Sequence, residues 1–397
     1  MEWIRFKNII FFSFITLSTL LFSCASDNAE EDTSKDVDIA TAYWEDYTPD
    51  PAKWGWIDTH NHPVIPAKFD DARDFSEGLA AVNYKGRWGY VDTKGAMRIE
   101  PQFMEARSFH EQKAAVKDFE GLMGFISATG DTIVPMKFIN LGDYRNGLAQ
   151  VQTETGWGYV DARGKQVLKP QFQRTWPFVT KHCARVKEGK AFALIDEQGR
   201  HLNKDKIDRI YAYSGGAFRF KKKGKYGLLD TSGKIVRPAI YDRITPSSQG
   251  KYLLIKGDEV SIFPGGHTFT RPADIRSLKY IGAGRIRFAK DTLMGLMDTT
   301  GRVVVSPSFV QINGFHDGLA LCARPGGDLW NWIRPDGTLF WKVDFPLAWD
   351  FYEGKARIIT SQGIGVIDKN GHTVIPPGYN ELRDFKEGLA RFQAYPE

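Results

Sequence analysis

The chain has 397 residues, of which 42% are hydrophobic, 25% charged and 13% aromatic, with 39 glycines and a net charge of +5. This composition excludes a chain that is disordered throughout, and the length allows two or three domains or one long array. Frequent aromatics and glycines favour short strands joined by tight turns over helices. The three cysteines include no Cys-x-x-Cys pair, which argues against a disulfide scaffold, and we expect Cys183 and Cys322 to be buried thiols.

The first 23 residues have the pattern of a targeting segment. A basic start is followed by an apolar run from Ile9 to Phe22, and Cys24 stands just after it. The run is short for a membrane span, although a signal anchor is the alternative interpretation. The ending LFSC resembles the lipobox of bacterial lipoproteins. That resemblance implies that residues 1–23 are a signal peptide and that Cys24 carries lipid, which would anchor the protein to a membrane.

Residues 24–46 form an acidic segment with eight acids, one lysine and few large apolar side chains. Such a segment cannot form a core, so we expect a flexible tether, and the remaining residues 47–397 are correspondingly basic. An acidic run after the lipidated cysteine also resembles the surface-export signal of lipoproteins in Bacteroidetes-type bacteria. It implies an exported outer-membrane lipoprotein facing the periplasm or the cell surface, with a plain solvated spacer as the alternative.

The stretch WGWIDTHNHPV at residues 54–64 resembles part of an active site. Its Asp58, His60 and His62 are similar to the first metal-binding segment of the amidohydrolase enzymes. A zinc enzyme needs further ligands and supporting carboxylates, and the other six histidines are scattered along the chain. The sequence also lacks the alternating strand and helix pattern of such enzymes. A metal-dependent hydrolase is therefore the least favoured alternative, and we predict no catalytic residue, metal or cofactor.

The same stretch opens a repeat that fills the rest of the chain. Its motif is Trp-Gly-aromatic-aliphatic-Asp, and the clearest copies place these residues at Trp54, Gly55 and Asp58; at Trp88, Gly89 and Asp92; and at Trp157, Gly158 and Asp161. Weaker copies start at residues 123, 192, 226, 260, 294, 330 and 364, so that ten starts are spaced 34 to 36 residues apart. Copies five, seven and nine depart most, and copy seven lacks the Trp, the Gly and the Asp.

Each copy also carries turn and strand signals. A turn follows the motif, with Gly three residues after its first residue in eight copies and Asp as that first residue in most of them, which is type I turn chemistry in which the carboxylate accepts backbone N–H bonds. An extended segment ending near proline, two aromatics and an alternating Gly-Leu-Ala segment complete the unit. The Gly of the motif allows another backbone to approach closely, and the Trp is expected to pack in the core. Three short strands fit one unit.

These motifs resemble the WG-repeat (KWG-type) family over about residues 50–397. We expect an all-β array of about ten three-stranded units in residues 47–397, because stacked units bury a continuous core. The array is either an open curved solenoid or a closed propeller-like ring. The first Trp-Gly strand has no preceding partner and the last strand, Gly388–Phe392, has no following one, so the two are able to close a ring. Ten units are many for a ring, and we favour the open array.

Two groups of residues are candidates for binding. The densest basic cluster is a candidate for phosphate or sulfate binding, with a solvated hairpin tip as the plainer interpretation; it consists of Arg219, Lys221, Lys222, Lys223 and Lys225. Four tryptophans outside the Trp-Gly position are candidates for an exposed surface, namely Trp44, Trp176, Trp341 and Trp349.

Together these patterns predict a non-enzymatic, envelope-anchored scaffold that presents a repeat surface for protein–protein interaction. Its partners would be the membrane, through the lipid, and an envelope protein or glycan, whereas nucleic acid is not expected at that location. Because tryptophans also stack on sugars, a carbohydrate-binding lipoprotein of a nutrient-uptake system is the first alternative. The oligomeric state is left open.

Overall fold

The computed structural model describes residues 52–203, 207–247, 249–326 and 329–395. The described residues form strands and no helix, and accordingly none of their elements is a helix that could cross a membrane. They all belong to one compact unit, Asp50–Glu397. The predicted signal peptide, Cys24, the acidic tether and Trp44 lie outside the described residues.

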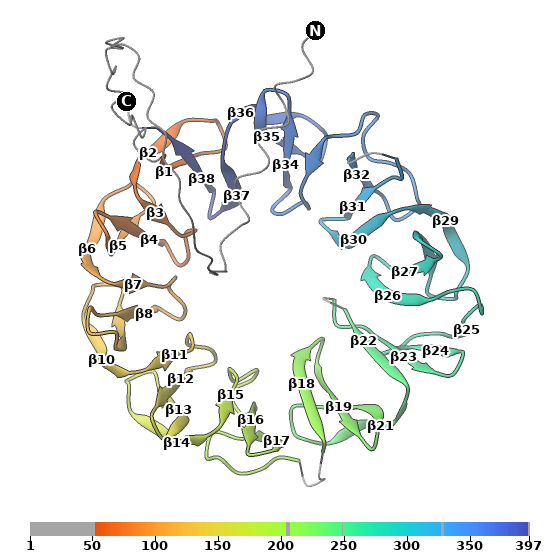
Figure 1. Ribbon diagram of the computed structural model, residues 1–397, viewed down its shortest axis with the longest axis horizontal. Coiled ribbons are helices and arrows are strands. Elements are labelled where there is room, and N and C mark those ends of the chain that lie inside the picture. The colour runs from red at the N-terminus through yellow and green to blue at the C-terminus, as the bar shows by residue number, and fades with distance from the viewer. Residues whose placement is uncertain (1–51, 204–206, 248, 327–328, 396–397) are drawn as a thin grey trace, which may run out of the picture. The chain divides into compact units, whose positions relative to one another are not determined.

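The all-β prediction is confirmed, since 38 strands form ten antiparallel sheets that stand around a ring like the blades of a propeller (Figure 1). Eight sheets have four strands and two have three. The predicted three strands per unit are therefore wrong for most blades. The additional strand is the innermost one and is often only two residues long, as in Asp71–Ala72, which is too short to show as an alternating pattern.

The strands of each blade are named in their order from the central opening outward, with labels that follow the chain. Blade 1 consists of β37 (Leu382–Lys386), β38 (Leu389–Ala394), β1 (Lys53–Ile57) and β2 (Pro63–Phe69). Blades 2 to 4 consist of β3 (Asp71–Ala72), β4 (Leu79–Tyr84), β5 (Arg87–Asp92) and β6 (Met97–Phe103); of β7 (Glu105–Ala106), β8 (Lys113–Lys117), β9 (Met123–Ser127) and β10 (Thr132–Phe138); and of β11 (Asn140–Leu141), β12 (Leu148–Thr153), β13 (Gly156–Asp161) and β14 (Gln166–Phe172).

The remaining blades follow the same order. Blades 5 to 7 consist of β15 (Arg174–Thr175), β16 (Ala184–Glu188) and β17 (Ala191–Ile195); of β18 (Arg209–Ser214), β19 (Ala217–Lys222), β20 (Lys225–Leu229) and β21 (Ile235–Tyr241); and of β22 (Arg243–Pro246), β23 (Tyr252–Lys256), β24 (Glu259–Phe263) and β25 (Thr268–Thr270). Blades 8 to 10 consist of β26 (Ser277–Gly282), β27 (Arg285–Lys290), β28 (Leu293–Asp298) and β29 (Val303–Phe309); of β30 (Gln311–His316), β31 (Leu319–Ala323) and β32 (Trp330–Ile333); and of β33 (Leu347–Ala348), β34 (Lys355–Thr360), β35 (Gly363–Asp368) and β36 (Thr373–Tyr379).

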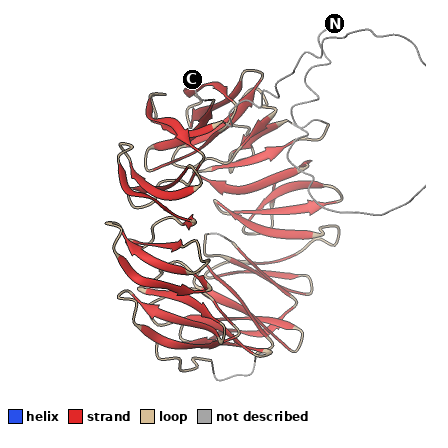
Figure 2. Ribbon diagram, turned by 60° about the vertical axis from the view of Figure 1, so that its left-hand side comes forward, coloured by secondary structure: helices blue, strands red, loops and turns tan. Residues whose placement is uncertain are grey.

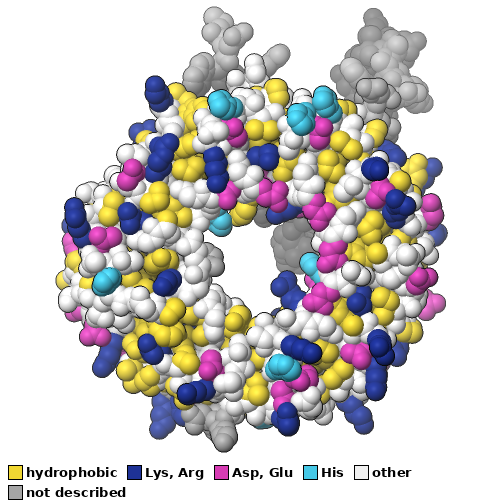
Figure 3. All heavy atoms as spheres, turned by 180° about the vertical axis from the view of Figure 1, so that it is seen from behind, with side chains coloured by type: hydrophobic (Ala, Val, Ile, Leu, Met, Phe, Trp, Pro, Cys, Tyr) yellow, Lys and Arg dark blue, Asp and Glu magenta, His cyan; other side chains and the backbone are white. Residues whose placement is uncertain are grey.

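The ring is closed by its first and last strands. β1 pairs with β38 in a continuous antiparallel register from Lys53↔Ala394 to Ile57↔Ala390. The open array that the sequence favoured is therefore wrong, and the alternative of a closed ring holds. Closure pairs two strand edges that an open array would expose. Ten blades are accommodated because the ring keeps a wide central opening, which Figure 3 shows in a space-filling view.

The hydrophobic core lies between neighbouring blades. Trp88 and Tyr90 of blade 2, for example, pack with Phe109 and Val116 of blade 3, and the rings of Tyr90 and Phe109 are 4.9 Å apart. The strands of successive blades lie face to face through the thickness of the ring (Figure 2). Each blade therefore buries its apolar side chains only against its two neighbours, which is why a single unit would not fold alone.

The Gly of each Trp-Gly motif allows the fourth strand to approach the third. An alanine Cβ would lie 2.5 Å from the Ile65 carbonyl oxygen at Gly55, 2.5 Å from that of Ile99 at Gly89 and 2.4 Å from that of Leu168 at Gly158. The strand register shifts at the same points, as between Trp88 and Tyr90. These glycines therefore set the spacing of the outer strands.

Copy seven forms a blade without the motif. It has Ser261 where seven other copies have glycine, and β24 pairs with β25 in a regular register from Glu259↔Thr270 to Ser261↔Thr268. The outer strand β25 is only 3 residues long. With a side chain in place of the glycine, the fourth strand pairs regularly but briefly, so the ring tolerates the degenerate copy.

The ring has two faces, which we name by their loops. The turn face carries the Asp turns between third and fourth strands, such as Asp92–Ala96, and the turns between first and second strands, such as Ser76–Gly78. The tip face carries the hairpin tips between second and third strands, such as Lys85–Gly86. Where a single residue links one blade to the next, as Met104 does, it also lies on the tip face, because the N–H of Met104 bonds to the Lys117 carbonyl at the end of β8.

Candidate functional site

Asp58, His60 and His62 form a turn on the turn face. The Asp58 Oδ1 accepts hydrogen bonds from the N–H groups of His60 at 2.8 Å and His62 at 2.9 Å, while both imidazole rings are more than three-quarters exposed. The last repeat has the same arrangement, in which Asp368 accepts from the N–H of His372. Asn61 takes the positive φ of 64° that glycine takes elsewhere.

A metal ion at this turn would need further ligands beside Asp58, His60 and His62. Among the described residues no group of three or more His, Cys, Asp or Glu side chains is arranged to hold a metal ion. The Asp58 carboxylate already binds the turn backbone. The three residues thus have the geometry of a repeat turn.

The other aspartates of the clearest copies have the same role. Asp92 accepts from the N–H groups of Lys94 and Ala96, and Asp161 accepts from those of Arg163 and Lys165, all at 2.9 Å. Burial acts to raise the pKa of Asp92, but bonds from the Ala96 and Lys94 N–H groups and from Arg98 outweigh it, so the pKa lies below the usual 3.8. Hydrogen bonds to the charged form have this effect.

We expect the ring to lose stability in acid because several turn aspartates share a lowered pKa; they are Asp58, Asp92, Asp196, Asp230, Asp298, Asp336 and Asp368. A carboxyl group whose pKa is lower in the folded than in the unfolded state stabilises the fold at pH values above its unfolded pKa, which is near 3.8. This contribution is lost as the pH falls through the lowered pKa values. Thermal melts between pH 7 and pH 2 should show a midpoint that falls steeply below about pH 4. Asp92→Asn, which keeps an acceptor but does not titrate, should reduce the slope; a midpoint unchanged down to pH 2 would contradict the account.

A series of glutamates links neighbouring blades on the turn face. The Glu77 carboxylate accepts from the N–H groups of Glu111 at 2.8 Å and Gln112 at 2.7 Å in the next blade. Glu387 caps the corresponding turn of blade 2, and Glu111 caps that of blade 4. Acidic side chains gather along one side of the central opening in Figure 3. These glutamates occupy paired N–H groups that would otherwise attract an anion.

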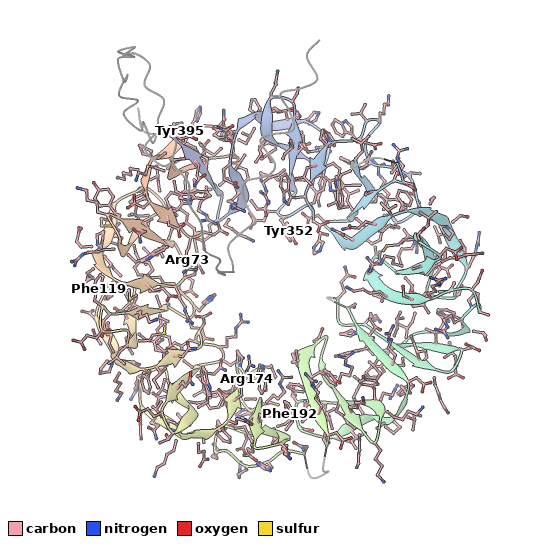
Figure 4. The ribbon with its side chains drawn as sticks, viewed as in Figure 1. Arg73, Phe119, Arg174, Phe192, Tyr352 and Tyr395 are labelled. Atoms are coloured by element: carbon pink, nitrogen blue, oxygen red, sulfur yellow. The ribbon has the colours of Figure 1, made fainter. Side chains whose placement is uncertain are left out.

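Arginines on the inner side of the ring form a second link between blades. In seven of the ten blade interfaces an arginine donates to a carbonyl oxygen on the inner strand of the following blade; the pairs are Arg391 to Ala72, Arg73 to Ala106, Arg107 to Leu141, Arg185 to Ile210, Arg219 to Ile244, Arg287 to Ile312 and Arg357 to Leu382. Figure 4 labels Arg73 toward the central opening. These arginines therefore hold neighbouring blades together around the opening.

Three of the four candidate tryptophans are described by the structure, namely Trp176, Trp341 and Trp349, and these are half-buried and lie against cations or the core. The Arg185 guanidinium lies 3.7 Å from the centre of the Trp176 ring, and that of Arg357 lies 4.2 Å from the Trp349 ring. Trp341 packs in the cluster between blades 9 and 10. Because one face of Trp176 and of Trp349 is covered by a cation, neither tryptophan offers both faces to a sugar.

The basic cluster of blade 6 is divided between different surroundings. Arg219 donates to the Ile244 carbonyl at 2.6 Å, and Lys225 is paired with Asp242. Lys221 lies over the Tyr226 ring, the Lys223 N–H donates to Asp208 in the hairpin tip, and Lys222 lies on the same strand. Alternation along β19 separates Arg219 and Lys221 from Lys222. Two aspartates, Asp208 and Asp242, contact the tip of the cluster and offset part of its positive charge. Anion binding by this cluster stays a prediction.

The model of the WG containing repeat matches seven stretches that together make up more than half of the chain, namely residues 54–88, 88–118, 123–154, 157–190, 226–258, 294–321 and 364–394. The chain belongs to the WG-repeat family. The three copies without a match are copies five, seven and nine, which are the copies that depart most from the motif. All ten copies nevertheless contribute a third strand to a blade of the WG-repeat ring.

Solved structures similar to the WG-repeat ring are remote in sequence. A eukaryotic initiation factor is 12% identical with a TM-score of 0.46, and the match covers 87% of this chain and 99% of that chain. The computationally designed protein Ika8 is 11% identical with a TM-score of 0.33 (76% and 93% covered), and PorZ of Porphyromonas gingivalis is 11% identical with a TM-score of 0.27 (82% and 54% covered). No curated protein matches the sequence. These similarities are too remote to bear on function.

The tip face of the WG-repeat ring carries exposed apolar side chains on four consecutive blades. Five large apolar residues are between 39% and 60% exposed there, namely Tyr395 in blade 1, Tyr84 in blade 2, Phe119 in blade 3, and Met104 and Ile139 in the links to blades 3 and 4. Figure 4 labels Phe119 and Tyr395 toward the outer edge. We call these five residues the apolar row. The sequence analysis missed the row because its members lie outside the repeated motif, in hairpin tips (Tyr84 and Phe119) and in links between blades (Met104 and Ile139).

Proposed function

We propose that this WG-repeat protein is a non-enzymatic scaffold that binds a protein partner through the apolar row and is held at the cell envelope by lipid on Cys24. The observation that carries the proposal is the row itself. Single exposed apolar residues are normal, but a group on one face of neighbouring blades is typical of an interaction site. Two of its five members are tyrosines and one is a phenylalanine, and aromatic residues are enriched in protein interfaces.

The closed ring supports a binding role because it presents the row on a fixed framework. Glutamates and arginines join neighbouring blades through hydrogen bonds, as Glu77 and Arg107 do, and β1 joins β38. A surface held in its binding conformation loses less conformational entropy when a partner binds. The Arg87 guanidinium lies 5.0 Å from the Phe119 ring centre and gives the row a charged neighbour, as at a polar rim.

A pull-down from the native envelope tests the proposal. The double variant Met104→Ser, Phe119→Ser should lose a protein partner that wild type retains, with a loss of at least about tenfold in affinity, since aromatic anchors contribute much of the binding energy. Val303→Ser, an equally exposed apolar site on β29 in blade 8, is the matched control and should retain the partner. Equal retention by the double variant, or a partner that is a glycan alone, would contradict the proposal.

The anchor has its own test. Labelling of the living host with a radioactive fatty acid should mark the wild-type protein and not the Cys24→Ala variant, which should leave the membrane fraction because a lipid chain provides the affinity for the bilayer. Unlabelled wild-type protein would contradict the lipid anchor while leaving the apolar row untouched.

A further inference from the structure

Two arginines of the inner series, Arg391 and Arg357, have a carboxylate partner, whereas Arg185 has none among the described residues. Arg219 and Arg287 lack one there as well. In blades 1 and 10 the arginine that donates to the next blade's carbonyl also donates through Nε to an aspartate two residues further along that strand. Arg391 bonds to Asp74 at 2.6 Å and Arg357 to Asp384 at 2.6 Å. The corresponding arginine of blade 5 is Arg185, which donates to Ile210, and the residue two further along is Ala212.

Arg185 is buried and incompletely bonded. Its side chain is only 8% exposed, and its Nε has no hydrogen-bond partner in the structure. A buried N–H donor without an acceptor destabilises a fold by about 1–3 kcal/mol, and more when the group is charged. Arg219 of the same series also has a buried Nε without a partner, but Arg185 in addition lines a pocket, so an acceptor for its Nε has a place to bind.

A pocket lies at this place. It has a volume of about 320 Å³, lies between blades 5 and 6, and is lined by Arg185 and Ala212 together with apolar rings and chains that include Trp176, Phe178 and Tyr213. Arg145 of blade 4 also lines it, and none of its described lining residues carries a carboxylate. The walls are thus mainly apolar, with two cations, which is the usual make-up of a site for a small organic ligand.

Two further arginines, Arg174 and Arg209, lie close enough to Arg185 to repel it. Burial, together with repulsion from Arg174 and Arg209, lowers the pKa of Arg185 to about 10, so it stays charged at neutral pH. Figure 4 labels Arg174 on the inner side of blade 5. Cations that repel one another without an intervening anion favour the binding of a negative group.

We propose that this pocket binds the carboxylate of a small organic acid with an apolar body. The carboxylate would accept the Arg185 Nε–H in the place that Asp74 and Asp384 occupy at the matching interfaces. The apolar body would lie against Trp176, Phe178 and Tyr213. A bare inorganic anion would leave these walls without contact. The site is independent of the apolar row, which lies on the tip face of blades 1 to 4.

Ligand-detected NMR titration of the full-length protein tests the proposal. The probes are benzoate, a free small acid, and N-acetylphenylalanine, which stands for a peptide C-terminus; benzamide is the neutral counterpart, and inorganic phosphate is the bare anion. At least one of the two acids should bind in a 1:1 ratio and about tenfold tighter than benzamide or phosphate, because only a carboxylate on an apolar body uses both Arg185 and the walls. Which acid binds distinguishes the two sources of the group.

The decisive variant is Ala212→Asp, which supplies the missing carboxylate from the protein itself. It should raise the melting temperature and weaken acid binding by about tenfold or more. Ala162→Asp, an exposed turn position in blade 4 with the same change in charge, is the matched control and should bind like wild type. Equal acid binding by Ala212→Asp, equal binding of benzamide, tighter binding of phosphate, or no binding of either acid would overturn the proposal.

Discussion

Replacement of Gly89 by alanine is expected to lower the free energy of unfolding by about 3 kcal/mol or more. The added Cβ would lie 2.5 Å from the Ile99 carbonyl oxygen and 2.7 Å from the Pro101 nitrogen, which are backbone atoms of the neighbouring strand. Those atoms can move away only if β6 leaves β5, and this would break the pairing of Tyr90 with Ile99. Urea unfolding followed by circular dichroism measures the effect.

The matched control for this substitution is Gly378→Ala in β36. An alanine Cβ there meets no atom within 4 Å, and the backbone of this glycine is not in the left-handed region. The control should therefore have a free energy of unfolding within about 1 kcal/mol of wild type or slightly above it. If Gly89→Ala were as stable as Gly378→Ala, the proposed close approach of the strands would be incorrect.

Removal of β38, by ending the chain at Lys386, is expected to abolish the cooperative folded state. β38 supplies Leu389, Ala390 and Phe392 to the cores on both sides of blade 1, and it pairs with β1 along five residues. Its loss exposes the edge of β1 and leaves Asp74 without Arg391. An exposed edge strand is a site of aggregation, so size-exclusion chromatography should show aggregates in place of a monomer-like species.

A chain that ends at Tyr395 is the control for this truncation, since it keeps all of β38. It should melt like the full-length protein. A truncated chain ending at Lys386 that kept the melting temperature of wild type would mean that the ring does not depend on closure.

The features that the sequence predicted are those confined to one repeat. The motif, its spacing and its copy number indicated ten units and the family, and the Asp-x-x-Gly pattern corresponds to turns such as Asp92–Gly95 in the structure. The possibility that the first and last strands pair was visible because each lacked a partner in the sequence. The sequence did not decide between the open and the closed form, because that choice depends on the angle between successive blades, which no single repeat encodes.

The features that the sequence analysis missed are contacts between different blades. In blades 2 and 3 the inner arginine directly follows the first strand, as Arg73 opposite Ala81, whereas in blade 5 it comes from the second strand as Arg185. Only knowledge of the strand register shows that these positions are equivalent. The basic cluster of blade 6 shows the same limit, because adjacent residues such as Lys221 and Lys222 lie on opposite faces of one strand. The apolar row is likewise assembled from hairpin tips and links.

The central claim is that residues 52–395 form a closed ring, and disulfide trapping between its two ends tests it most directly. Lys53 and Ala394 are directly paired across β1 and β38, so Lys53→Cys and Ala394→Cys place two thiols at disulfide distance. Cys24 is replaced by serine, and the two remaining cysteines are buried with pKa values raised by burial to about 12, which keeps them unreactive. Mild oxidation should join the new thiols within one chain and shift its mobility on a denaturing gel, whereas the control pair Lys53→Cys, Ala162→Cys should stay reduced. Failure of the Lys53–Ala394 pair to cross-link within a folded monomer would contradict the closed ring.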